Sequence, residues 1–421
     1  MKNGFSVVLL AAGMSSRFWP LYEKFALPMF GKPLILHEID HIQRLRPKGI
    51  VVVANESNVS MLRSILGKQY KLVDLVVQKG EGQGAALVAA AEKIYGPTLI
   101  VNSSDVYSFE LLDQLVAKWQ KQRGMLITAR KVTHYYPGGY LKLHENGSVE
   151  RIIEKPDPAD VPSDLVRVVA EMAPSLQELA DAYLPDDDPK EGEVAILNRL
   201  ISKGHTCDTF VTNEFWTPIK YPWHLLDVLE YFLGILTPQR GKNLVLADNV
   251  HISGTVYLGD NVKIFENTKI TGPCYIGNNT IIGNNNIIRA SHIGANCVTG
   301  FNTDITRSYI GDNCWFHSNY IGDSVLEGNV SLGSGTVLAN FRFDEGEIYS
   351  TVKEERVNTK RTKLGAIIGK NVRVGVNTSI MPGIKIGTNS LISAGIVVDC
   401  DIAENTFCYG KTELVLKKNE R

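Results

Sequence analysis

A six-residue rhythm in the second half of the chain constrains its fold more than any other feature. An aliphatic residue followed by Gly recurs at 258–259, 276–277, 282–283, 293–294, 310–311, 321–322, 332–333, 368–369 and 386–387. The first three of these glycines are 18 and 6 residues apart. Six residues make one flat side and a turn, so about 18 residues complete a triangular coil with its aliphatic residues stacked inside. The period predicts a left-handed parallel β-helix of hexapeptide repeats over residues 245–421.

One charged segment interrupts this period. Residues 342–363 contain no aliphatic–Gly unit and are rich in Lys, Arg and Glu. We expect this insertion to form a loop that projects from the coils, because it cannot supply the stacked aliphatic side chains of a coil.

The first half of the chain has a different rhythm. Apolar, strand-like runs at 51–54, 75–78 and 99–102 are separated by helical segments at 59–66 and 85–95. This order is typical of an α/β fold with a Rossmann-like, mixed and mostly parallel sheet covered by helices on both faces. We therefore expect a first domain over residues 1–238. Its ligands should bind at the carboxyl ends of the strands.

Composition narrows the partners and the compartment. A formal net charge of −1 gives no broad attraction to nucleic acid or to an anionic membrane, which favours small-molecule substrates. The 6 Cys include no Cys-x-x-Cys pair and no zinc spacing, so they are expected to be buried apolar residues of a reduced, cytoplasmic protein. No apolar run reaches the roughly 18 residues of a membrane span. We expect no membrane partner.

A loop suited to phosphates follows the first strand-like run, Val7–Leu10. Ala11, Ala12 and Gly13 leave no large side chain between a ligand and the backbone N–H groups, and Arg17 and Lys24 add positive charge. From the residues alone, the alternative is an ordinary strand-to-helix turn followed by solvated basic residues.

The longer stretch from Val7 to Pro33, with its tail FALPMFGKPLI, resembles the fingerprint of the sugar-1-phosphate nucleotidyltransferases. The resemblance implies that a sugar-1-phosphate attacks the α-phosphorus of a nucleoside triphosphate and releases pyrophosphate, with Mg²⁺ as cofactor. It also implies that Arg17 holds the leaving pyrophosphate and Lys24 the reacting phosphates. Ser15 stands where the family usually has a second Gly, and the segment before Lys24 is shorter than in many members.

Two further segments resemble nucleotide and metal motifs of that family. The run Gly82-Gln83-Gly84-Ala85-Ala86 is similar to the turn that packs on the base and ribose, although tight helix packing would also select these residues. Asp105 follows an apolar strand and resembles the family's Mg²⁺ ligand, while a lone Asp in that place is often a turn former or helix cap.

The sugar side of the predicted site rests on the same resemblance. Gly139, Glu154 and Lys155 look like the residues that bind the sugar hydroxyls and the sugar phosphate. One departure is serious: the segment 215–226 resembles a family motif whose second metal ligand is here Pro218, which has no side-chain oxygen.

The repeat half carries its own set of polar residues. His317-Ser318-Asn319-Tyr320, Asn340 and the run VGVNTSIMPGIKIG resemble the archaeal-type bifunctional enzymes that acetylate glucosamine-1-phosphate and then uridylylate it. This resemblance implies acetyl-CoA as cosubstrate, a homotrimer, and His317 as general base. Tyr320 and Asn340 would orient the amino sugar. Ala394 would line the coenzyme channel.

Two observations leave alternatives open for the repeat half. His317 and Tyr320 could simply decorate a coil face. Relatives tend to carry lysines where this chain has Gly346 and Tyr349, which affects the identity of the acetyl acceptor.

Three functions are therefore in competition. The first is a bifunctional nucleotidyltransferase and acetyltransferase acting on sugar phosphates. The second is a thymidylyl- or guanylyltransferase whose β-helix only assembles subunits. The third, to which Pro218 lends weight, is a non-catalytic regulatory homologue.

Overall fold

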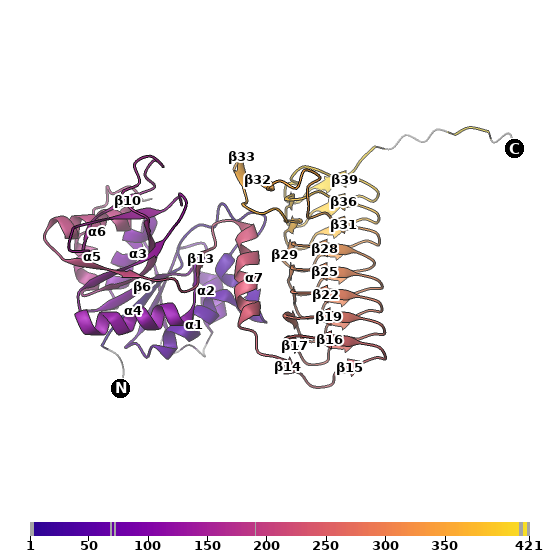
Figure 1. Ribbon diagram of the computed structural model, residues 1–421, viewed down its shortest axis with the longest axis horizontal. Coiled ribbons are helices and arrows are strands. Elements are labelled where there is room, and N and C mark those ends of the chain that lie inside the picture. Colours follow the sequence, from indigo (N-terminus) through magenta and orange to yellow (C-terminus); the bar gives the residue numbers. More distant parts are fainter. Residues whose placement is uncertain (1–3, 68–69, 71–72, 190, 412–415, 419–421) are drawn as a thin grey trace. The chain divides into compact units, whose positions relative to one another are not determined.

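The computed structural model describes residues 4–67, 70, 73–189, 191–411 and 416–418 (Figure 1). The chain forms two compact units. The first contains Met1–Met14 and Pro33–Pro218, and the second contains Ser15–Lys32 and Ile219–Arg421. The predicted domains, 1–238 and 245–421, follow the change of sequence pattern and differ from these units at residues 15–32 and 219–238. That division stays a prediction about folding units.

The first unit is built on a nine-stranded mixed sheet. Its strands are β1 (Ser6–Leu10), β4 (Ile50–Ala54), β5 (Val73–Val77), β6 (Thr98–Asn102), β8 (Met125–Lys131), β9 (Gly139–Leu143), β10 (Val149–Glu154), β11 (Leu165–Ala173) and β12 (Cys207–Val211). The main path runs β10-β9-β11-β6-β1-β4-β5, and β1 pairs in parallel with β4 and β6. Buried Val and Leu residues along β1 and β4 suit strands covered on both faces. The predicted α/β fold is confirmed.

Helices cover both faces of this sheet. They are α1 (Leu34–Arg44), α2 (Val59–Leu66), α3 (Gly82–Ala91), α4 (Phe109–Gln122), α5 (Leu176–Asp181) and α6 (Gly192–Ser202). Helix α4 shows why one of them begins and ends where it does: the Ser108 hydroxyl accepts the Leu111 N–H, and Arg123 closes the helix in a left-handed conformation. A short second sheet pairs β7 (Asp105–Tyr107) with β13 (Trp216–Pro218).

The second unit begins with connecting elements. These are η1 (Lys24–Ala26), β2 (Pro28–Met29), β3 (Lys32–Pro33), η2 (Pro222–His224) and α7 (Leu225–Gly234). The boundary between the units falls within β3, because Pro33 belongs to the first unit. The rest of this unit is a stack of coils whose strands form three parallel ladders.

The first ladder contains β14 (Gln239–Arg240), β17 (Val256–Leu258), β20 (Cys274–Ile276), β23 (His292–Ile293), β26 (Tyr309–Ile310), β29 (Val325–Leu326), β34 (Ile367–Ile368) and β37 (Lys385–Ile386). The second contains β15 (Val245–Leu246), β18 (Lys263–Ile264), β21 (Ile281–Ile282), β24 (Val298–Thr299), β27 (Trp315–Phe316), β30 (Ser331–Leu332), β35 (Arg373–Val374), β38 (Leu391–Ile392) and β40 (Phe407–Cys408). The third contains β16 (His251–Ser253), β19 (Lys269–Thr271), β22 (Ile287–Arg289), β25 (Asp304–Thr306), β28 (Tyr320–Gly322), β31 (Val337–Leu338), β36 (Ser379–Ile380) and β39 (Val397–Val398).

Stacked side chains hold these short strands together. One buried aliphatic residue per coil forms a column inside the stack, as at Ile276, Ile293 and Ile310. Many turns place Asn in the left-handed region, and the Asn243 amide donates to Asn261 at 3.0 Å while the Asn261 amide donates to Asn279 at 2.9 Å. Asn tolerates this conformation better than other side chains. The predicted β-helix is confirmed, and Figure 1 shows its third ladder rung by rung.

The charged insertion is an antiparallel hairpin, β32 (Tyr349–Val352) with β33 (Glu355–Asn358). It is tied to the coils, because the Ser350 hydroxyl donates to the Gly383 carbonyl at 2.9 Å and the Lys385 ammonium donates to the Thr351 carbonyl. The insertion therefore leaves the repeat, as expected, but part of it lies on the coil surface.

An aromatic ladder explains why residues 15–32 belong to the second unit. Tyr257, Tyr275, His292 and Tyr309 stack on successive coils with ring centroids 4.7, 4.8 and 4.9 Å apart. Phe30 stacks on Tyr275, with ring centroids 4.9 Å apart, and its N–H donates to Nε2 of His292 at 3.2 Å. His292 must therefore be neutral, with its Nδ1–H donating to the Ile310 carbonyl at 3.0 Å.

This ladder makes the second unit sensitive to acid. Burial lowers the pKa of His292 to about 4, whereas an unfolded His titrates near 6.5. Since the unfolded chain binds the proton more readily, the stability contributed here is present above pH 6.5 and is lost as the pH falls toward 4, by about 2 kcal/mol at pH 5. We expect His292→Phe to lose less thermal stability than wild type between pH 7 and pH 5.

Melting curves at both pH values measure this difference. His251→Phe is the matched control, because His251 is an exposed histidine of the same β-helix. An equal acid shift in wild type and His292→Phe would show that His292 is not the sensitive group.

Candidate functional site

A cavity of about 210 Å³ lies at the carboxyl ends of β1 and β6 in the first unit. Its lining residues are Leu10, Ala12, Gly13, Gln78, Gly82, Gln83, Ala86, Asn102, Ser104 and Pro189. Four predicted nucleotide-binding residues thus come together here: Ala12, Gly13, Gly82 and Gln83. The fifth, Ala11, is buried directly before them, and its carbonyl accepts the Asn58 amide at 2.8 Å.

The backbone on one wall of this cavity is open to a ligand. A Cβ added to Gly13 would meet no atom within 4 Å, so the loop after β1 presents its peptide groups to open space. Residues of the first turn of α3 form the other wall, and the Glu81 side chain does not cap this helix. The N–H groups of a helix N-terminus suit phosphate oxygens.

Packing also requires the glycines of α3. Gly82 has φ +83°, and a Cβ there would lie 2.4 Å from the Pro189 carbonyl oxygen. A Cβ on Gly84 would lie 2.6 Å from the ring of Tyr183. Tight packing therefore explains why Gly82 and Gly84 are glycines. The same turn can still bind a nucleotide, so the two explanations do not exclude each other.

Asp105 is held on the short sheet of the first unit. It is buried, its Oδ2 accepts the Trp216 indole N–H at 2.7 Å, and its Oδ1 accepts the Asn102 amide at 3.3 Å. In the register of β7 and β13, Pro218 lies directly opposite Asp105. The position that the sequence resemblance assigns to a second metal ligand is thus next to the first, and it carries proline.

Of the two predicted metal positions on this short sheet, Asp105 has a carboxylate and Pro218 has none. Within the described ranges, no group of three His, Cys, Asp or Glu side chains is placed to hold an ion. Mg²⁺ in nucleotide sites commonly takes one or two carboxylates and completes its shell with waters and substrate phosphates. Asp105 fits that single-carboxylate arrangement.

Arg17 and Lys24 belong to the second unit rather than the first. The exposed Arg17 guanidinium lies 5.9 Å from the centroid of the Tyr221 ring. The Lys24 ammonium donates to the Ile219 carbonyl at 2.8 Å.

The predicted sugar-side residues are neighbours. Gly139 pairs with Glu154 across β9 and β10, and a Cβ on Gly139 would lie 3.0 Å from Glu154 Oε2. The Lys155 ammonium lies 3.1 Å from Glu154 Oε1, and the Lys155 backbone has φ +45°. The glycine therefore leaves the space that the carboxylate occupies, and Lys155 is held in an uncommon conformation beside it.

Sequence reasoning missed two sets of buried ionisable side chains. Glu38 of α1 is buried, and burial raises its pKa to about 8, with the nearby Asp105 charge adding to the shift. Arg167 forms a buried cluster with Glu171 at 2.8 Å and Glu193 at 2.7 Å, and burial raises the pKa of Glu171. The sequence did offer a signal for Glu38, because its carboxyl group lies among the apolar residues of the segment that forms α1. Nothing in the pattern pairs Arg167 with residues on two elements.

The predicted acetyl-transfer residues lie on consecutive parts of the coils. His317 directly follows β27, and its side chain is exposed, whereas its backbone N–H donates to Asn319 Oδ1 at 2.8 Å. Tyr320 opens β28, and its hydroxyl donates to Asn340 Oδ1 at 3.4 Å. The structure thus brings Tyr320 and Asn340 together and fixes the backbone of His317.

Ala394 lies at the same corner of the coils as His317. His317 follows β27 and Ala394 follows β38 one residue later, and the two strands belong to one ladder, β27-β30-β35-β38. Adjacent strands are about 4.8 Å apart, so three steps place the two residues roughly 15 Å apart along the coil axis. An extended coenzyme arm running along this corner would pass both.

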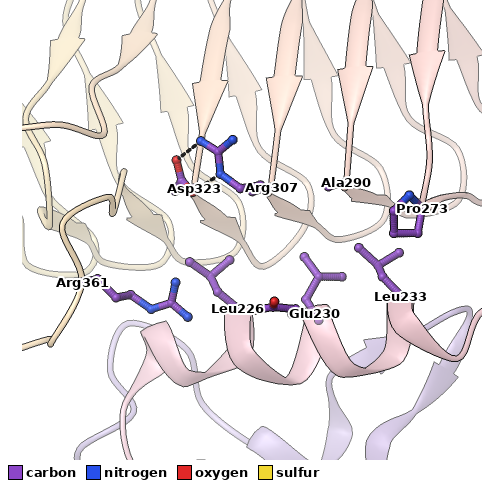
Figure 2. A pocket seen from close by; sticks show the side chains of 9 residues that line it. Leu226, Glu230, Leu233, Pro273, Ala290, Arg307, Asp323 and Arg361 are labelled. Atoms are coloured by element: carbon purple, nitrogen blue, oxygen red, sulfur yellow. Dashed lines mark hydrogen bonds and ion pairs between the residues drawn. The ribbon is translucent and has the colours of Figure 1, made fainter.

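A second cavity, of about 300 Å³, lies between α7 and the coils (Figure 2). Leucines of α7 form its apolar side, and Arg307 and Asp323 stand on its coil side. The Arg361 guanidinium, also in its lining, pairs with Asp227.

Three family models match parts of this chain. The nucleotidyl transferase family matches residues 6–181, the bacterial transferase hexapeptide family residues 255–290, and the hexapeptide repeat of succinyl-transferase residues 365–400. A solved structure described as a putative glucose-1-phosphate thymidylyltransferase from Bacillus anthracis overlays with a TM-score of 0.46 at 16% identity, covering 53% of this chain and 93% of that chain. None of the described helices has the length and apolar character to span a bilayer.

Relatives match over nearly the whole chain. The bifunctional protein GlmU of Methanococcus vannielii is 31% identical, covering 98% of this chain and 99% of its own length. A bifunctional sugar-1-phosphate nucleotidylyltransferase/acetyltransferase of Sulfurisphaera tokodaii is also 31% identical, covering 95% of this chain and 98% of its own. At this identity over nearly the full length of both chains, the chain belongs to the family of bifunctional sugar-1-phosphate nucleotidylyltransferases/acetyltransferases that includes these archaeal proteins.

Proposed function

We propose that this chain joins a nucleoside triphosphate to a sugar-1-phosphate in its first unit and acetylates an amino-sugar-1-phosphate on its β-helix. The observation that supports the first activity best is the cavity where the open backbone at Gly13 faces the first turn of α3. Both walls offer backbone N–H groups, which suit a triphosphate.

Positioning and charge accomplish the first reaction. A phosphate oxygen of the sugar-1-phosphate forms a bond to the α-phosphorus of the triphosphate. The bond between the α-phosphorus and the oxygen that bridges it to the β-phosphorus breaks, so pyrophosphate leaves. We assign phosphate binding to Ala12 and Gly13, and positive charge to Arg17 and Lys24, which follow them in the chain. Glu154 and Lys155 would receive the sugar phosphate. Bound Mg²⁺, with Asp105 as its protein ligand, would neutralise the crowded phosphate oxygens.

The second reaction needs a base on a rigid support. The amine nitrogen attacks the thioester carbonyl of acetyl-CoA, His317 takes the proton that the amine loses, and the coenzyme leaves as a thiolate that regains a proton. Tyr320 and Asn340 would orient the amine, and Ala394 would contact the coenzyme. A neutral imidazole suits this task near pH 7.

We also propose that the protein is a cytoplasmic homotrimer. Exposed apolar side chains around the acetyl-transfer residues support association of subunits, notably Trp315, Phe341 and Phe343. The cysteines of the described chain form no disulfide, in keeping with a reducing compartment.

Pro218 favours a second candidate function, that of a non-catalytic regulatory homologue. Its place opposite Asp105 favours a regulatory homologue, in which the first cavity binds nucleotide without turnover. No specific observation favours a β-helix that only assembles subunits. The exposed His317 and the nearby Tyr320–Asn340 contact favour a chemical role for the coils instead.

Asp105→Asn tests the first activity. We expect a loss of about 10²-fold in pyrophosphate release, because an amide cannot supply the charge that a metal bridging phosphates needs. Asp74→Asn, at an exposed aspartate on β5, is the control and should release pyrophosphate like wild type. Equal rates in wild type and Asp105→Asn would remove this carboxylate from the mechanism.

Pro218→Asp tests whether the missing ligand limits turnover. The new carboxylate would lie opposite Asp105 in the β7–β13 register, so pyrophosphate release should rise, with a stronger dependence on Mg²⁺ concentration. An unchanged Mg²⁺ dependence in a folded variant would show that this position does not reach the metal.

His317→Ala tests the second activity separately. We expect thiol release from acetyl-CoA with amino-sugar-1-phosphates to fall by about 10²–10⁴-fold, while pyrophosphate release persists. His251→Ala, at another exposed histidine of the coils, is the matched control. If wild type releases no thiol with any amino sugar, the β-helix is better described as an assembly domain.

A further inference from the structure

One corner of the coils departs from the rule that the other turns follow. Left-handed turn positions are mostly Asn or Gly, but three successive coils of this corner have Ala290, Arg307 and Asp323 there, with φ of 44°, 47° and 46°. A long side chain such as that of Arg307 gains nothing from this conformation. Residues kept in an unfavourable backbone conformation often have a role beyond the fold.

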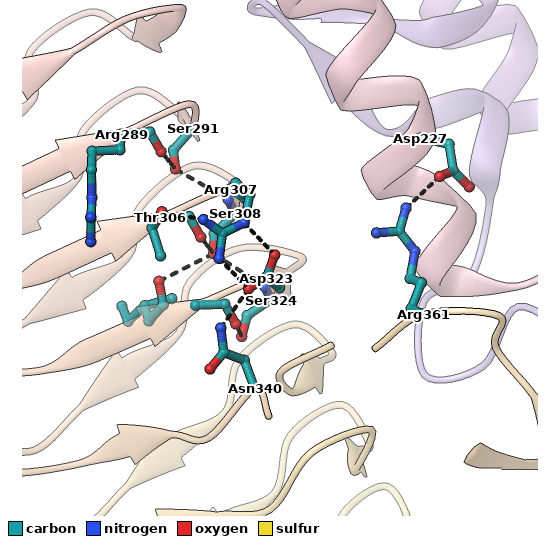
Figure 3. Close-up of polar contacts among 12 residues, drawn as sticks. Asp227, Arg289, Ser291, Thr306, Arg307, Ser308, Asp323, Ser324, Asn340 and Arg361 are labelled. Carbon is teal, nitrogen blue, oxygen red and sulfur yellow. Dashed lines mark hydrogen bonds and ion pairs between the residues drawn. The ribbon is translucent and has the colours of Figure 1, made fainter. Parts of the chain in front are cut away.

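Arg307 and Asp323 make a bidentate ion pair between neighbouring coils. Nε and Nη2 of Arg307 donate to the two carboxylate oxygens of Asp323 at 2.7 and 2.8 Å. The Asp323 side chain is buried, whereas that of Arg307 is half exposed. Figure 3 shows that the same carboxylate also accepts the amide of Asn340.

The carboxylate decides which way the Asn340 amide faces. An ionised carboxylate paired with arginine can only accept hydrogen bonds, so the amide nitrogen of Asn340 must point at Asp323. Its carbonyl oxygen then points to the other side, where it accepts the Tyr320 hydroxyl at 3.4 Å. Each donor and acceptor in these contacts is therefore fixed: Arg307 and the Asn340 amide donate to Asp323, and the Tyr320 hydroxyl donates to the Asn340 carbonyl oxygen.

We propose that Asp323 is a positioning residue for the acetyl acceptor, which it serves by holding the Asn340 carbonyl oxygen toward Tyr320 and the incoming amine. This inference rests on the proposed acetyl transfer. A neutral amine that is about to attack carries N–H bonds that need an acceptor. If the Asn340 amide were flipped, its NH₂ group would face the N–H groups of the amine, and neither group could accept a hydrogen bond from the other.

The neighbouring cavity suggests a competing role for the same pair. Arg307 and Asp323 line the space opposite Leu226 and Leu233 of α7, so they could simply close its polar end (Figure 2). That role concerns the folding of the second unit. It predicts a change in stability with no selective effect on binding of the amino sugar.

The test uses the full-length protein and compares Asp323→Asn with Asp304→Asn. Asp304 pairs with Arg289 through two contacts of 2.9 Å on the adjoining coils. This pair is more exposed, and in the part of the chain that the structure describes Asn340 bonds to Asp323 and not to Asp304. Acetyl transfer is followed by thiol release, with glucosamine-1-phosphate and acetyl-CoA varied in turn. Melting curves are recorded for both variants.

In Asp323→Asn we expect the KM for the amino sugar to rise about tenfold or more, because the Asn340 amide is free to flip. Its kcat should change by less than about threefold, since His317 is untouched, and the KM for acetyl-CoA should stay at the wild-type value. Asp304→Asn should match wild type in all three constants.

A double variant provides the rescue. Asn340→Asp in the Asp323→Asn background restores an obligate acceptor facing Tyr320, so the amino-sugar KM should fall back toward wild type although Arg307 remains without its carboxylate. A KM in Asp323→Asn equal to that of wild type, or a rise that the double variant fails to reverse, would overturn the positioning role alone. A wild-type protein that releases no thiol would instead overturn the proposed acetyl transfer and this inference with it.

Discussion

The stacking of one coil on the next is the constraint on which the second unit depends. Its strands are only two or three residues long in the ladders, too short to be stable as isolated pairs, so each coil is held by its neighbours through main-chain hydrogen bonds and a shared aliphatic column. The Asn ladders in the turns add amide contacts at the same spacing. Side chains attached to such a stack have fixed positions, which is what a general base and its orienting groups require.

The residues proposed for acetyl transfer lie close to places where the repeat is interrupted. Arg307 and Asp323 occupy left-handed turn positions, which elsewhere in the stack are mostly Asn or Gly, and Asn340 precedes the hairpin insertion. In the first unit the reverse holds: the cavity comes from the ordinary geometry of parallel strands, whose carboxyl ends bring the Gly13 loop and Asn102 to one edge. The two proposed activities thus arise from two different structural rules.

Sequence reasoning succeeded where a local rule determines the structure. The hexapeptide period predicted the coils, and strand order predicted that ligands bind at the carboxyl edge of the sheet, where the cavity beside Gly13 lies. It failed where contacts join residues far apart in the chain. The aromatic ladder that draws Phe30 onto Tyr275 depends on rings one coil apart, and no local pattern announces it. The polarity of the Asn340 amide likewise depends on a carboxylate 17 residues away.

The central claim is that one chain carries both activities, and a single incubation tests it most directly. Wild-type protein would be given an amino-sugar-1-phosphate, acetyl-CoA and the four nucleoside triphosphates with Mg²⁺, and thiol, pyrophosphate and product mass would be followed together. The account predicts that an N-acetylated nucleotide sugar accumulates while both thiol and pyrophosphate are released. Pyrophosphate without acetylated product, or neither product across a panel of amino sugars, would contradict it.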